Sequence, residues 1–234
     1  MRKERRNSDA KKSMATRAMS SQSRARLRAP LSQRGRGLDK NECNQFAPPE
    51  DWYEPSEEVT TDYRVITQQP GDGYRHVVTV SEIRERLSLL PDEALLPLEV
   101  VQLSRMTKKK QSFPCYGMQW GATLYLYPIE ESLIEYFPSP PRPAQFNEAK
   151  QFGGRWVQEG TEWQLVWTES TLKDFYLNNI LIHELGHLLD DRNTSYTDRE
   201  RYAEWFAIEH GLKKSKRAGA KKPRKKRVRR RHHS

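Results

Sequence analysis

The chain has 234 residues, of which 35% are hydrophobic and 31% charged, so it is long enough for one domain but too polar to fold from end to end. No apolar run reaches the roughly 18 residues of a membrane-spanning helix, and the two cysteines are too few for a disulfide framework. These features, and an N-terminus without an apolar signal, lead us to expect a cytoplasmic protein with no membrane association.

Charge is distributed unevenly along the chain. Residues 1–40 carry 13 Lys and Arg against 3 acids, and residues 212–234 carry 13 Lys and Arg with no acid. Residues 41–211 hold 15 basic and 28 acidic side chains. We therefore predict a disordered basic N-terminal region over 1–60, a folded domain over 61–211 and a disordered basic C-terminal tail.

The folded part is expected to begin near Tyr74. The β-rich run 76–80 predicts a strand, and Ser81 is a candidate N-cap for a short helix that ends before Pro91. Its apolar residues recur at helical spacing, with Leu90 as the last.

Further strands are predicted over 98–103 and 122–127, with Lys108–Lys110 in a solvated loop between them. The prolines within 138–143 exclude a helix or a central strand there.

A hairpin and two helices should close the domain. The hairpin pairs residues 155–158 with 163–167. The helices cover 170–189 and 198–210, and Gly211 is expected to end the second helix. The order of strand, helix, several strands and two helices predicts an α+β fold.

Residues 183–187 read His-Glu-Leu-Gly-His, the HExxH motif. On a helix, side chains four positions apart share one face, so His183 and His187 can bind one metal ion. Zn²⁺ suits two neutral imidazoles and leaves a position for water, whose proton Glu184 can accept as a general base. The alternative is two unrelated histidines, but the surrounding helix is apolar around most of its girth, and buried histidines need partners.

A third metal ligand is expected on the following helix. Glu200 lies beside the inward face of that helix, whereas Glu204 lies further round toward solvent, so Glu200 is the better candidate. The alternative role for Glu200 is local, as the closing residue of a capping box that begins at Thr197. Asp190 and Asp191 remain minor candidates, because both follow the second histidine closely.

This pattern, HExxH followed by a glutamate three residues before Ala203, resembles the gluzincin metallopeptidases. The ending Ala203-x-x-Phe206-Ala207 is most similar to the ImmA/IrrE-type peptidases. The resemblance is strong over about 25 residues and extends to the order of strands over about 110 more. The resemblance implies a zincin-like body, with a small mixed sheet, an active-site helix and a glutamate helix, and an enzyme that hydrolyses peptide or protein substrates. The roles that it implies are Zn²⁺ ligation by His183, His187 and Glu200 and general-base catalysis by Glu184.

In folds of this kind, an edge strand above the active-site helix binds the substrate as an added strand. We expect 153–157 to be that edge, with Trp163 and Trp167 packed in the core of the same hairpin. An oxyanion-stabilising donor is also expected, and the sequence does not choose among its three candidates, Tyr196, Tyr202 and His210.

The run from Lys221 to Arg231 is dense in cationic residues and favours sequence-independent binding of nucleic acid, at the ribosome or nucleoid, or nuclear import in a eukaryotic host. Docking on the acidic domain and a purely solubilising role are the alternatives. The rival function for the whole chain is therefore a nucleic-acid-associated protein with a structural or inactive zincin body. Glu184 argues against it, because a structural zinc site needs no general base.

Overall fold

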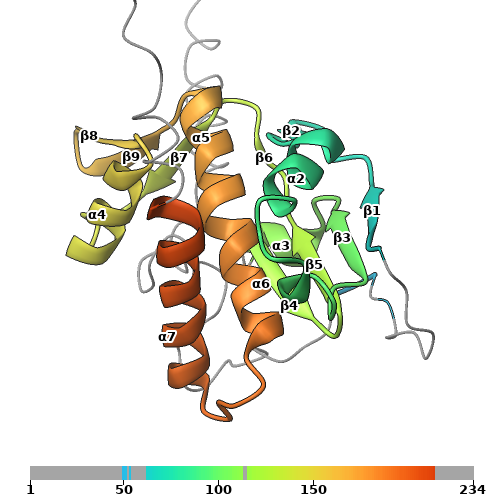
Figure 1. Ribbon diagram of the computed structural model, residues 1–234. Helices are drawn as coiled ribbons and strands as arrows, with labels where there is room; N and C mark the ends of the chain where they lie inside the picture. Colours follow the sequence, from blue (N-terminus) through green and yellow to red (C-terminus); the bar gives the residue numbers. More distant parts are fainter. Residues whose placement is uncertain (1–48, 52, 54–61, 113–114, 214–234) are drawn as a thin grey trace, which may run out of the picture.

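The computed structural model describes residues 49–51, 53, 62–112 and 115–213. These residues form a mixed α+β body in which one long helical run separates a four-stranded sheet from a three-stranded sheet (Figure 1). A third sheet has two short strands, which pair Tyr74–Arg75 with Ile129–Glu130. The strands are β1 (Arg64–Thr67), β2 (Tyr74–Arg75), β3 (Val100–Leu103), β4 (Gly117–Trp120), β5 (Thr123–Leu126), β6 (Ile129–Glu130), β7 (Ile134–Phe137), β8 (Arg155–Glu159) and β9 (Glu162–Val166). The helices are α2 (Val80–Leu87), η3 (Asp92–Ala94), α3 (Lys108–Ser112), α4 (Pro143–Gln151), α5 (Glu169–Phe175), η4 (Tyr176–Ile180), α6 (Leu181–Leu189), α7 (Tyr196–Phe206) and η5 (Ala207–Leu212).

The larger sheet has the strand order β1-β3-β5-β4, in which the first three strands are parallel and β4 is antiparallel. All residues of β3 and β5 are buried, which matches their rich content of apolar and β-branched residues. Four of them form the face of the sheet that belongs to the hydrophobic core: Val101, Leu103, Leu124 and Leu126. The strands predicted over 98–103 and 122–127 are therefore confirmed, each slightly shorter than expected.

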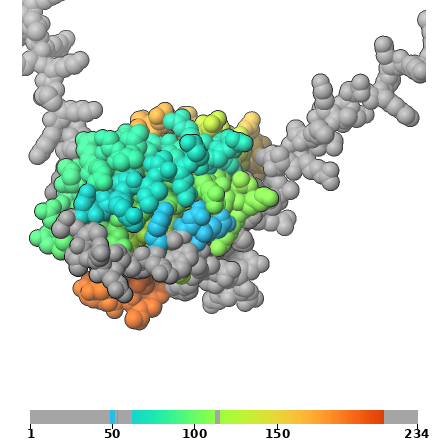
Figure 2. All heavy atoms as spheres, turned by 90° about the vertical axis from the view of Figure 1, so that its right-hand side faces the viewer, coloured from blue at the N-terminus to red at the C-terminus, as the bar shows by residue number. Residues whose placement is uncertain are grey.

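The N-terminal segment of the described chain lies against the opposite face of this sheet. The backbone N–H of Tyr53 donates a hydrogen bond to the hydroxyl of Tyr125 at 3.3 Å, and Asp51 forms an ion pair with Arg105 at 3.1 Å. Figure 2 shows this segment in blue on that side of the molecule. Residues 49–51 and 53 precede residue 61, the predicted start of the folded domain, and Asp51 and Tyr53 contact it.

The three-stranded sheet is antiparallel, with the order β7-β9-β8. It contains the predicted hairpin as β8 and β9, and Gly160 in the turn has a φ of +61°, a conformation that favours glycine. Trp167 is buried and stacks on Phe175 at 5.0 Å between ring centroids, and Trp163 packs against the edge of the core. The predicted core role of both tryptophans is confirmed.

Two long helical runs cross the centre of the molecule, antiparallel to each other (Figure 1). The first comprises α5, the π-helical turn η4 and α6, and it matches the first predicted helix. The second comprises α7 and the π-helical turn η5. It begins earlier than predicted because the hydroxyl of Ser195 accepts a hydrogen bond from the backbone N–H of Asp198, and it continues through Gly211, which does not stop it.

Two glycines allow these helical runs to approach closely. A Cβ atom at Gly186 in α6 would lie 2.9 Å from the Cα of Ala203 in α7. A Cβ atom at Gly211 in η5 would overlap the carbonyl oxygen of Asn178 in η4. The helix pair is thus in backbone contact at two levels, about two turns apart along each run.

The region before β3 differs from the sequence expectation. The strand predicted over 76–80 is wrong: β2 ends at Arg75, and α2 begins at Val80. Thr79, not Ser81, is the N-cap, because its hydroxyl accepts from the backbone N–H of Glu82 while the Glu82 carboxylate accepts from the Thr79 backbone. The helix ends at Leu87, one turn earlier than expected.

Other elements were missed or misassigned. The domain starts before Tyr74, because β1 pairs in parallel with β3. The lysines expected in a loop form the single turn α3, where the Thr107 hydroxyl accepts from the Lys110 backbone at 3.2 Å. The last of the prolines, Pro143, starts α4 at a position where its missing N–H costs nothing. Strands β4, β6 and β7 had no predicted counterpart.

Candidate metal centre

The HExxH residues lie in α6, at the centre of the molecule. His183, Glu184 and His187 are 1%, 0% and 4% exposed, respectively. Leu181 and Leu185 on the same helix belong to the hydrophobic core, so the packing of the helix fixes the direction in which the polar side chains point. Burying imidazoles and a carboxylate in such surroundings requires partners of matching chemistry.

Three side chains converge there: His183, His187 and Glu200. The Nε2 atoms of the two histidines are 3.1 Å apart. The Glu200 carboxylate reaches both, with Oε2 at 3.5 Å from His183 Nε2 and Oε1 at 3.2 Å from His187 Nε2. In a tetrahedral zinc site with bonds of about 2.0–2.1 Å, neighbouring ligand atoms are about 3.3 Å apart. The distances between the two imidazole nitrogens, and from each of them to one Glu200 oxygen, are close to this value, and this group could hold a metal ion.

Glu200 reaches the histidines because α6 and α7 are in contact. The close approach at Gly186 brings the first turns of α7 against the end of α6. The Arg199 guanidinium donates a hydrogen bond to the backbone carbonyl of His187 at 3.1 Å, which links the two helices at the level of the ligands. Glu200 is 5% exposed, so its carboxylate is held inside this contact.

The structure separates Glu200 from the alternatives. Glu204 and Asp191 are exposed. Asp190 is buried, but both of its carboxylate oxygens accept hydrogen bonds from the Asn193 side chain, at 2.9 and 3.1 Å. The capping box considered for Thr197 and Glu200 does not form, because α7 is capped two residues earlier. Among the described residues, no second group of His, Cys, Asp and Glu side chains has its ligand atoms this close together.

Glu184 lies against the outer strand β4 of the larger sheet. A Cβ atom at Gly117 would be 2.7 Å from the Ile180 side chain and 3.2 Å from Oε1 of Glu184. The glycine therefore makes the space in which the carboxylate lies. Sequence reasoning missed this residue, although a glycine within a strand is a signal for the close approach of another group.

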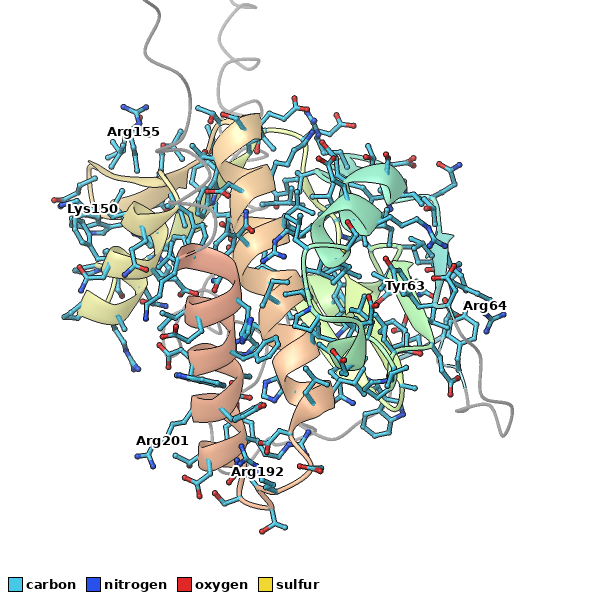
Figure 3. All side chains as sticks on the ribbon, in the orientation of Figure 1. Tyr63, Arg64, Lys150, Arg155, Arg192 and Arg201 are labelled. Carbon is cyan, nitrogen blue, oxygen red and sulfur yellow. The ribbon has the colours of Figure 1, made fainter. Side chains whose placement is uncertain are left out.

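The edge that we predicted to bind the substrate, 153–157, lies at a distance from the candidate metal centre. β8 is an outer strand, but the glycine before it, Gly153, packs against Thr171 in α5. Thr171 precedes His183 by three helical turns, roughly 18 Å along the axis. Figure 3 shows Arg155 of β8 and Arg192, just after α6, at opposite ends of the molecule. The outer strand beside the candidate metal centre is β4.

The three candidate oxyanion donors occupy different places. Tyr196 lies one helical turn before Glu200 in α7, on the same side of the helix. Tyr202 packs its ring near Phe206, with the Arg192 guanidinium 5.5 Å from its centroid. His210 lies in η5, at the far end of the helix pair. Of the three, Tyr196 is the one placed next to a ligand.

A polar cluster that the sequence did not reveal lies beside Glu184. The Lys110 ammonium is 3.2 Å from the Cys115 sulfur and 4.2 Å from the centre of the Tyr127 ring. Burial raises the pKa of the Tyr127 phenol well above its usual value, and the negative charge that Cys115, Tyr125 and Glu184 can carry raises it further. Tyr127 is therefore a neutral hydrogen-bonding group at physiological pH.

Comparison with protein-family models, with curated proteins and with solved structures gave no match to this chain. Within the described residues, no helix combines the length and the apolar character needed to span a bilayer.

Proposed function

We propose that this protein is a zinc-dependent metallopeptidase, with His183, His187 and Glu200 as the zinc ligands and Glu184 as the general base. The observation that carries the proposal is the convergence of three buried side chains: the two Nε2 atoms lie 3.1 Å apart, and each lies 3.2–3.5 Å from one of the two Glu200 oxygens, close to the separation of ligand atoms in a zinc tetrahedron. Imidazole and carboxylate are ligands that zinc accepts, and a site with three protein ligands leaves the fourth position to a reactant, as catalytic zinc sites do. That the mixed α+β body is zincin-like is also part of this proposal.

A zinc ion bound there would polarise the scissile carbonyl and lower the pKa of a water molecule to about 7. Glu184, which follows the first ligand directly, would accept the proton of that water and deliver it to the departing amine. Its side chain is fully buried and lies against Gly117, which leaves the carboxylate little room to move. Tyr196, beside Glu200, is the residue of this chain that we assign to the oxyanion.

The substrate would bind as an extended peptide along β4. In the described part of the chain this strand pairs on one side only, with β5, and it packs against the helix that carries Glu184. An added strand would gain backbone hydrogen bonds there, with its scissile bond beside the ligands. The sequence that the enzyme prefers would then depend on side chains of β4 such as Gln119.

Zinc content and peptide cleavage test the proposal together. We expect about one zinc per chain in the native protein, and none in His187→Ala. We expect Glu184→Gln to keep the zinc and the fold and to lose cleavage of a peptide library by several orders of magnitude, because the amide preserves the shape and cannot accept the proton.

The rival function, nucleic-acid association with an inactive body, is supported by the cationic segment after residue 213, which lies outside the described residues. It predicts a different result from the same experiment. A wild-type protein that holds zinc, binds RNA and cleaves no member of the library would favour the rival. Equal cleavage by wild type and Glu184→Gln would reject Glu184 as the base.

A further inference from the structure

A buried arginine joins the two helical runs at the end opposite the candidate ligands. Arg86 in α2 is 6% exposed. Its Nε donates a hydrogen bond to the side-chain oxygen of Asn178 in η4 at 2.6 Å, and one of its terminal nitrogens donates to the backbone carbonyl of His210 in η5. Asn178 is itself held, because its amide donates to the Asp174 carboxylate at 2.6 Å. One guanidinium therefore connects both ligand-bearing runs.

The two segments that Arg86 binds are the π-helical turns of these runs. A π-helical turn accommodates an additional residue, and the wider turn changes the hydrogen bonding of its carbonyl groups. At this level Gly211 and Asn178 are in backbone contact, so the spacing of the helices is set by η4, η5 and the guanidinium between them. Burial lowers the pKa of Arg86 to about 10, which still leaves it protonated at neutral pH.

Two of the ligands, His187 and Glu200, lie beyond the second contact, at Gly186 and Ala203, whereas His183 lies between the two contacts. The helix pair can be treated as two rods that touch at Gly186 and Ala203. A change of spacing or rotation at η4 and η5, about 12 Å from this contact, would then shift His187 and Glu200 relative to His183. Zinc ligands need positions that are accurate to a few tenths of an ångström.

We propose that Arg86 is a positioning residue for the metal centre: by bridging Asn178 and the His210 carbonyl, it fixes the relative placement of α6 and α7 that brings Glu200 to the two histidines. This inference rests on the proposed zinc site. It requires no peptidase activity, so it can be tested separately from the catalytic part of the proposed function.

The test measures zinc affinity by competition with a chelator, and ligand geometry by the visible absorption of the cobalt-substituted protein. We expect Arg86→Met to weaken zinc binding by about 10-fold to 100-fold, the range found for residues that orient metal ligands, and to change the cobalt spectrum. Arg86→Lys keeps the charge but not the planar fork, so we expect a smaller loss. It also provides the measurement if Arg86→Met does not fold.

The control variants lower the stability of the fold but keep the hydrogen bonds of Arg86 to Asn178 and to the His210 carbonyl. Ile83 lies on the same helix and is fully buried, so Ile83→Val and Ile83→Ala form a graded series that lowers the melting temperature. Zinc affinity and the cobalt spectrum should be unchanged in these variants, measured where all are folded. Wild-type affinity in both Arg86 variants, or an equal loss in the Ile83 series, would overturn the inference. A wild-type protein that holds zinc but cleaves nothing would remove the peptidase activity and leave this result standing.

Discussion

The two ends of the α6–α7 helix pair both contain buried ionisable side chains, but these are balanced differently. At the far end, Arg86 donates hydrogen bonds to an amide oxygen and a backbone carbonyl, and the Asp174 carboxylate nearby favours its charged form. At the near end, two imidazoles and the carboxylate of Glu200 converge, with Glu184 alongside. Imidazole Nε2 and carboxylate oxygens all supply lone pairs when deprotonated, so this end has the composition of a cation site.

This difference indicates that the two ends of the helix pair have different roles. At the far end, hydrogen bonds from Arg86 link both helical runs without any added group. The near end gathers side chains that could hold a metal ion, and an ion bound there would be expected to stabilise it. Four changes test this comparison, in order of decreasing effect.

The largest effect is expected from Glu200→Ala, compared with Glu204→Ala. Both carboxylates lie on α7 four residues apart, but one is buried beside the histidines and the other is exposed. Loss of an actual ligand should cost more than the 10-fold to 100-fold found for residues behind the ligands. Zinc content after dialysis should fall toward zero in the first variant and stay at one in the second. The reverse pattern would make Glu204 the ligand.

Gly117→Ala should affect the base and spare the ligands. The added methyl would lie 2.7 Å from the Ile180 side chain and 3.2 Å from Glu184 Oε1, so the carboxylate must move. A displacement of about 1 Å in a catalytic group can lower the rate about 100-fold. We expect kcat/KM for a cleaved peptide to fall by that order with zinc content unchanged, and Met118→Ala in the same strand to act as the control. Unchanged kcat/KM would show that the glycine does not position Glu184.

Gly186→Ala and Gly211→Ala compare the two contacts of the helix pair. Each methyl would meet backbone atoms of the opposite run, and such overpacking typically costs about 1–3 kcal/mol of unfolding free energy. If a shift at one contact moves the helices at the other, both variants should lower the affinity for zinc about 10-fold, although Gly211 is far from the ligands. Zinc affinity that changes only in Gly186→Ala would limit the coupling to the near end.

The smallest effect concerns the anchoring of α2, which carries Arg86. Burial opposes ionisation of Glu82, but hydrogen bonds from Lys173, at 2.7 Å, and Thr79 outweigh it and lower the pKa of the carboxyl below its ordinary value of 4.5. A carboxyl whose pKa is lower in the folded protein than in the unfolded chain stabilises the fold at pH values above the unfolded pKa. This stabilisation is lost as the pH falls through the pKa of the folded protein. Because the pair is partly exposed, Glu82→Gln should cost under about 1 kcal/mol at pH 7. The difference in melting temperature from wild type should shrink below about pH 4.5; a constant difference would contradict it.

Local patterns predicted the features that depend on residues close in sequence. The helix around His183 was predictable because apolar residues surround its girth, and the hairpin was predictable from its alternating aromatic residues and its glycine turn. The choice of Glu200 over Glu204 also followed from the helical period. The start of α2 was mistaken because the valines before Thr79 suit a strand, and the capping box at Thr79 decided otherwise.

Sequence by itself therefore determined which residues could bind a metal, because spacing on one helix fixes which side chains share a face. Tertiary structure decided what surrounds them. The strand beside Glu184 is β4 and not β8, because β4 pairs with β5 and packs its glycine on α6. The bridge from Arg86 joins residues 92 and 124 positions away, and no local pattern carries information over that distance. Such contacts depend on how helices and sheets pack, which only the complete fold defines.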